Sequence, residues 1–148
     1  MPLAHDNPLF QRVKQSFERQ GLMHHLSVEL IDVKPGEVIL HMPFSQQVTQ
    51  QNGYFHAGGT SAVADSAGGY AGYTLMPEGA EVLTVEFKIN LLAPAQGDYL
   101  EAVGKVIRSG RTLTITQVDV FAISKEQRIH VALAQQTLIT LLTRGKHE

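Results

Sequence analysis

Residues 58–76 read GGTSAVADSAGGYAGYTLM, and this stretch decides which fold we expect. It is rich in alanine and other small residues, and Pro77-Glu78-Gly79 follows it, so the pattern predicts a helix over 58–76. Each glycine inside a helix costs roughly 1 kcal/mol relative to alanine. Gly68, Gly69 and Gly72 are therefore best explained by a backbone that approaches closely, as when the helix packs tightly against a sheet.

The segments on both sides of this helix predict that sheet. Apolar and polar residues alternate over 26–30 and again over 38–42, with a turn at Pro35-Gly36 between them. After the helix, the same criteria predict strands over 84–91, 99–108, 112–123 and 128–142.

Two further details belong to this expected fold. In 112–123 the apolar phase moves from Leu113 and Ile115 to Val118 and Val120, which predicts a bulge. Asn7-Pro8 predicts the start of an additional helix over about 8–20, which Gly21 would end. The order of elements is an α+β pattern, and we expect a single domain over 1–148 with its core at about 26–142.

The composition excludes several classes of function. The 12 basic and 14 acidic residues give a formal charge of −2 without runs of like charge, so nucleic acid is not an expected partner. The absence of cysteine excludes disulfides, thiolate zinc sites and a cysteine nucleophile, and it fits a reducing compartment. With neither a signal peptide nor an apolar stretch that spans a bilayer, we expect a cytoplasmic protein that does not bind membranes.

Asp65 is the first candidate for chemistry. Between Glu37 and Glu78 it is the single Asp, Glu, Lys or Arg, and its neighbours in the predicted helix are small and apolar. An isolated ionisable group in such a setting is a candidate functional site. The alternative is that Asp65 lies on an exposed face of the helix or caps a local structure.

The second candidate is the segment Phe55-His56-Ala57-Gly58-Gly59, which leads into the helix. Small residues at a helix start leave N–H groups pointing outward at the positive end of the helix dipole, where they can hold an oxyanion or a polarised carbonyl. Taken singly, a glycine pair more often marks a turn and a histidine is more often structural. The combination of these donors with an acid about two turns later favours an active site.

These residues form a recognisable pattern: Gln50-x5-His56-Ala57-Gly58-x6-Asp65, then Val85-x-Phe87-x-Ile89-Asn90-Leu91-Leu92-x-Pro94, then Ser109-Gly110-Arg111-Thr112. The pattern resembles the PaaI-like branch of hotdog-fold acyl-CoA thioesterases, over roughly residues 26–142. The resemblance implies an antiparallel sheet wrapped around a central helix. It also implies a homodimer, or a tetramer made of two dimers, in which the sheets of two subunits run on and each active site is built from both chains.

The resemblance also implies roles for single residues. The backbone N–H groups of Ala57 and Gly58 would polarise the thioester carbonyl, and Asp65 would act as general base on a water or as nucleophile. Gln50 would orient the water or the thioester, and His56 would help to fix the loop. Thr84 falls where many members carry a Ser or Thr supplied by the partner subunit. The sequence departs from the family's usual His-Gly-Gly in having Ala57 after the histidine.

The expected substrate is the CoA thioester of an aryl or a short- to medium-chain acyl group. Basic side chains suit the CoA phosphates, and Asn52 and Gly59 are further candidates for substrate contacts. The basic candidates are Lys88, Arg108, Arg111 and Arg128. We expect no cofactor, and no metal because the histidines lack the spacing of metal ligands.

Other functions remain open because one fold supports several. A non-catalytic acyl-CoA-binding protein would bind ligand tightly without turnover. An acyl-thioester dehydratase or hydratase would hydrate a crotonyl thioester. A serine-triad hydrolase is not expected, because the chain has no G-x-S-x-G motif.

Overall fold

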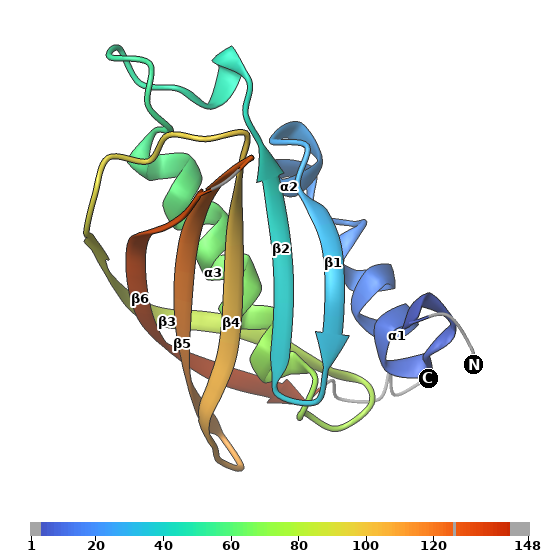
Figure 1. Ribbon diagram of the computed structural model, residues 1–148. Helices are drawn as coiled ribbons and strands as arrows, with labels where there is room; N and C mark the ends of the chain where they lie inside the picture. The colour runs from blue at the N-terminus through green and yellow to red at the C-terminus, as the bar shows by residue number, and fades with distance from the viewer. Residues whose placement is uncertain (1–3, 126, 143–148) are drawn as a thin grey trace.

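A six-stranded antiparallel sheet curves around one long helix, α3 (Ala57–Tyr73), which confirms the predicted α+β hotdog fold (Figure 1). The computed structural model describes residues 4–125 and 127–142. The strand order is β1-β2-β4-β5-β6-β3, and every neighbouring pair is antiparallel. The strands are β1 (Glu29–Lys34), β2 (Glu37–Pro43), β3 (Ala80–Leu91), β4 (Tyr99–Ser109), β5 (Leu113–Ser124) and β6 (Gln127–Leu142).

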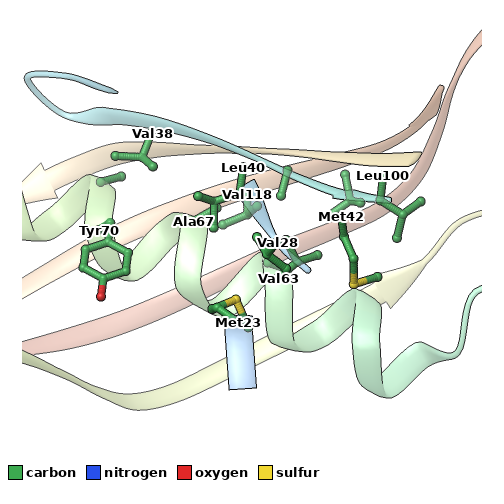
Figure 2. Packing of buried hydrophobic residues seen from close by; sticks show 14 of the residues in the cluster. Met23, Val28, Val38, Leu40, Met42, Val63, Ala67, Tyr70, Leu100 and Val118 are labelled. Carbon is green, nitrogen blue, oxygen red and sulfur yellow. The ribbon is translucent and has the colours of Figure 1, made fainter. Parts of the chain in front are cut away.

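The core lies between the concave face of the sheet and α3. Figure 2 shows side chains from the sheet meeting Val63 and Ala67 of the helix, with Met23 approaching from the N-terminal segment. Burial of this apolar surface is the main favourable term in folding. The fully buried side chains of the sheet include Val38, Leu40, Met42, Leu100 and Val118.

The glycines of α3 do not all have the same explanation. A Cβ at Gly68 would lie 1.6 Å from Gln136 Oε1, and one at Gly72 would lie 2.3 Å from Leu138 Cδ1. The predicted close approach is therefore confirmed at these two positions, although side chains of β6 rather than a backbone come close. At Gly69 the prediction is wrong, because a Cβ there would meet no atom within 4 Å.

The N-terminal segment differs from the prediction after its first helix. Helix α1 (Pro8–Phe17) begins as expected, since Asn7 Oδ1 accepts a hydrogen bond from the N–H of Leu9 at 2.8 Å. Gly21, however, opens a second helix, α2 (Gly21–His25), and β1 begins later than predicted, at Glu29. Short 3-10 helices, η1 (Ala4–Asp6) and η2 (Gln46–Val48), complete the elements.

The predicted bulge in β5 is also wrong. Thr114, Thr116, Val118 and Val120 all face inward, so the strand keeps one phase and two of its inward positions are polar. The irregularities lie on the neighbouring strands: the pairing with β4 shifts between Val106 and Arg108, and the pairing with β6 skips Val131, between Ala132 and His130. Thr116 faces inward because its hydroxyl has a buried partner, Gln136 on β6.

Strand β3 is an edge of the sheet and is unusually apolar for its exposure. It pairs with β6 on one side and has no neighbouring strand on the other side among the described residues. Its exposed apolar side chains are 45% to 57% accessible, and they are Leu83, Val85, Phe87 and Leu91. Exposed apolar edges of this kind mark an interaction surface. Within residues 4–125 and 127–142, no helix is long and apolar enough to cross a membrane.

Candidate active site

Asp65 lies in the middle of α3, partly buried, with its carboxylate turned towards β3 and β6. Its Oδ1 atom accepts a hydrogen bond from Thr84 Oγ1 at 2.7 Å and another from Gln136 Nε2 at 2.9 Å. Both bonds lie within one chain. The expectation that Thr84 is supplied to this site by a partner subunit is therefore wrong, because Thr84 bonds to the Asp65 of its own chain.

A cavity of about 390 Å³ opens beside Asp65, between α3, β3 and the N-terminal helix. Gly69, one turn beyond Asp65, lines it without a side chain. Its far end is polar, since Gln20 donates to the hydroxyl of Tyr70 at 2.9 Å and accepts from Ser66 at 3.2 Å. The segment after α1 thus closes the cavity through contacts that the sequence pattern does not predict.

The start of α3 forms a separate group. His56 caps the helix, because its Nδ1 accepts a hydrogen bond from the N–H of Gly58 at 2.7 Å. Its backbone N–H donates to the carbonyl of Val48 at 2.8 Å, which ties the preceding loop to the helix start. Among the described residues, the N–H of Ala57 has no acceptor, whereas that of Gly58 is already used by His56. Ala57 is therefore the better placed of the two predicted donors.

Gln50 lies beside this helix start and lines a second cavity of about 550 Å³ with His56 and Ala57. Its Oε1 accepts from the N–H groups of Asn52 and Tyr54 within the loop. The carbonyl oxygen of the amide is thus occupied, whereas its Nε2 has no hydrogen-bond partner among the described residues. Asn52 itself is exposed, and it contributes its backbone to this turn.

The two groups do not meet in one chain. Asp65 is eight residues after Ala57, which is about 12 Å along the helix at ~1.5 Å per residue. The cavity beside Asp65 and the cavity beside Ala57 share no lining residue. One thioester carbon cannot contact both groups of a single chain, so the combination of donors and acid expected from the sequence is not assembled by one subunit.

The candidate basic residues are dispersed. Arg108 is the second-last residue of β4, and Arg111 lies in the hairpin to β5, at the end of the molecule opposite the loop before α3 (Figure 1). Lys88 is exposed on β3. Arg128 is paired with Glu101 at 3.0 Å on the outer face of the sheet. A Cβ at Gly59, the remaining candidate, would lie 3.4 Å from Met42 Cε, so the helix start packs on the core there.

The outer face also carries Glu101, whose pKa is displaced by its neighbours. Burial raises the pKa of Glu101, but hydrogen bonds from His41 at 2.8 Å and from Arg128, together with their charges, outweigh it and hold this pKa below its usual value of 4.5. These residues lie on β2, β4 and β6, so the cluster ties three strands together. Within the described part of the chain, no three His, Asp or Glu side chains converge as metal ligands do.

The chain has clear relatives. A family model described as "Thioesterase superfamily" matches residues 52–128, just over half of the chain. A solved structure of a thioesterase family protein from Silicibacter pomeroyi is 41% identical with a TM-score of 0.89, and the match covers 91% of this chain and 99% of that one. Human acyl-coenzyme A thioesterase 13 is 29% identical over 93 residues, which cover 62% of this chain and 66% of the human protein. The PaaI protein of E. coli has the same fold, with 21% identity, a TM-score of 0.80, and coverage of 95% of this chain and 99% of that one.

Proposed function

Because the chain belongs to the thioesterase superfamily, we propose that it hydrolyses the thioester of an aryl or short- to medium-chain acyl-CoA to the free acid and CoA. The observation that carries this proposal is the carboxylate of Asp65, which is held by two donors at one oxygen and lies beside a cavity. A cytoplasmic location is part of the proposal, since a chain without cysteine fits a reducing compartment.

In the proposed reaction, Asp65 takes a proton from a water while the water oxygen bonds to the thioester carbon. The carbonyl oxygen gains negative charge, which the N–H of Ala57 and the helix dipole stabilise. The C–S bond then breaks, and the thiolate of CoA leaves and is protonated. In the alternative route, Asp65 itself bonds to the carbonyl carbon, and water hydrolyses the resulting mixed anhydride.

The site requires two chains in this proposal, and the edge strand β3 supplies the way to join them. One end of β3, Glu81 to Thr84, lines the cavity beside Asp65, whereas Leu91 at the other end lines the cavity beside Ala57. If the β3 strands of two chains pair antiparallel about a two-fold axis, the Asp65 half-site of each chain meets the Ala57 half-site of its partner. The exposed apolar residues of β3 support this pairing. A tetramer of two such dimers is compatible with it.

The test is a thiol-release assay across acyl-CoAs of graded length, including phenylacetyl and benzoyl thioesters, with the Asp65→Asn variant. We expect this variant to keep the wild-type melting temperature and to lose about 10²-fold or more in kcat. Asp98→Asn, an exposed loop acid, is the matched control and should be fully active. Near-normal turnover by Asp65→Asn would remove Asp65 from the mechanism.

Asp65→Glu distinguishes the two routes. The longer side chain should be tolerated in part if the carboxylate acts through water, and it should be severely damaging if the carboxylate must attack the carbonyl directly.

A further inference from the structure

We infer that Gln136 of β6 is a positioning residue for Asp65, and that with Thr116 of β5 it aims the reactive oxygen of the carboxylate. The inference rests on the proposed role of Asp65. Gln136 has no contact with the cavity beside Asp65, so it would act through the carboxylate and not on the substrate.

The orientation of the Gln136 amide is set by a second bond behind it. The hydroxyl of Thr116 donates to Gln136 Oε1 at 2.9 Å, and the two residues are direct partners across β5 and β6. Gln136 is 2% exposed and Thr116 is fully buried. With its oxygen held by Thr116, the amide presents N–H to Asp65, at 2.9 Å from Oδ1. A flipped amide would place its oxygen against the carboxylate and leave the Thr116 hydroxyl without its acceptor, which is costly in a buried site.

The helix is built to admit this amide. A Cβ at Gly68 would lie 1.6 Å from Gln136 Oε1 and 2.8 Å from Thr116 Oγ1, so no side chain fits at position 68 while the pair is in place. A glycine in the middle of α3 lowers the stability of the helix by roughly 1 kcal/mol relative to alanine, but it leaves the space that Gln136 and Thr116 occupy.

The consequence for Asp65 is an asymmetric carboxylate. Thr84 and Gln136 both donate to Oδ1, and no donor contacts Oδ2 among the described residues. The two bonds fix the plane of the carboxylate, because both donors hold the same oxygen. Oδ2 is left as the oxygen that takes a proton or attacks.

Two substitutions test this role. Gln136→Met removes the donor with little change in volume. Gln136→Glu keeps the shape and the acceptor for Thr116 but places a second carboxylate against Asp65. The matched controls are Gln135→Met and Gln135→Glu, because the neighbouring Gln135 is exposed on the opposite face of the same strand.

For Gln136→Met we expect kcat to fall about 10-fold or more with KM little changed, since a misplaced catalytic group costs turnover rather than binding. For Gln136→Glu we expect the acid limb of the kcat profile to move to higher pH by about 1 unit or more, because two adjacent carboxylates cannot both ionise freely. The Gln135 variants should match the wild type in both measurements. Melting temperatures show whether each variant is folded.

The decisive comparison repeats Gln136→Met in the Asp65→Asn background. If Gln136 acts through Asp65, it should have little further effect there. An equal loss in both backgrounds, or wild-type kcat and pH profile in both Gln136 variants, would overturn the inference and leave Asp65 in place. If Asp65→Asn alone keeps wild-type turnover, the proposed function fails first, and this inference fails with it.

Discussion

At position 57 the side chain is a single methyl group, so the chemistry that this residue can offer is its backbone N–H. Ala57 is the first residue of α3, and His56 before it has an extended backbone with φ −67° and ψ 138°. Proline is favoured at the first position of a helix and also favours an extended residue before it. Position 57 therefore allows the N–H to be removed with little disturbance of the fold.

We predict that Ala57→Pro melts like the wild type and loses about 10² to 10³ in kcat, the usual effect of losing one oxyanion donor. Ala57→Gly, which keeps the N–H, is the control and should retain most activity. If well-folded Ala57→Pro turns over normally, the carbonyl is held elsewhere, and the N–H of Gly59 is then the next donor to test.

The sequence predicts a functional residue where a polar or charged side chain differs clearly from its neighbours in the chain. Asp65 is isolated among apolar neighbours, and His56 stands just before a glycine pair, so both could be selected from the sequence. Gln136 and Thr116 could not, because polar residues in a strand are normally expected on its outer face. A signal did exist: Gln136 occupies the phase of Ala134 and Leu138, both buried. Its partner Asp65 is 71 residues away, and no local pattern encodes that contact.

Among the elements, α3 provides a direct comparison of two glycines. Gly69 has open space at its Cβ position, whereas Gly72 faces Leu138. Both gain helix propensity when changed to alanine, but at position 72 the methyl group must displace a core side chain.

We predict that Gly69→Ala raises the free energy of unfolding by up to about 1 kcal/mol. The free energy of unfolding of Gly72→Ala should be about 1 to 3 kcal/mol lower than that of Gly69→Ala, because the added methyl group overpacks the core. Urea denaturation of the two variants measures the difference. Equal free energies of unfolding would show that Leu138 moves aside freely.

The cluster around Glu101 makes the sheet sensitive to acid. Its lowered pKa means that the folded state binds the proton more weakly than the unfolded chain does, so the stabilisation is present above the usual value of 4.5 and is lost as the pH falls through the folded-state value. We predict that Glu101→Gln is less stable than the wild type at neutral pH and that this deficit shrinks in acid. Denaturation on both sides of pH 4.5 tests this, with Glu78→Gln, an exposed position in the turn before β3, as the control. A deficit that is independent of pH would contradict it.

The elements themselves could be predicted from periodicity, but their irregularities could not. The central helix and most of the strands lie within a few residues of their expected places. The bulge was predicted in β5 because Thr114 and Thr116 are polar but face inward. A prediction from alternation assumes that the buried positions of a strand are the apolar ones. The sequence predicts Gly21 as the end of a helix, but Gly21 begins one, since a glycine fits either side of a helix boundary.

For the whole molecule, the separation of the two half-sites leads to a complementation test. We predict that mixing Asp65→Asn chains with Ala57→Pro chains restores one intact site in each mixed dimer, or about a quarter of the wild-type sites after random exchange. Activity should rise well above that of either parent. Mixing Asp65→Asn with Thr84→Ala is the control and should restore little, because Thr84 and Asp65 belong to one half-site. Failure of the first mixture, despite proven exchange of chains, would argue against a shared site.

The apolar edge of β3 also affects the solubility of a single chain before it pairs with a second chain in the proposed dimer. A strand with free N–H and C=O groups and a row of apolar side chains can template any other extended chain, so a lone subunit is at risk of aggregation. In the proposed dimer this edge is covered, and by mass action the melting temperature then depends on protein concentration. A charge introduced at Val85 or Phe87 should therefore block pairing of this edge, and the melting temperature of the variant should no longer depend on protein concentration.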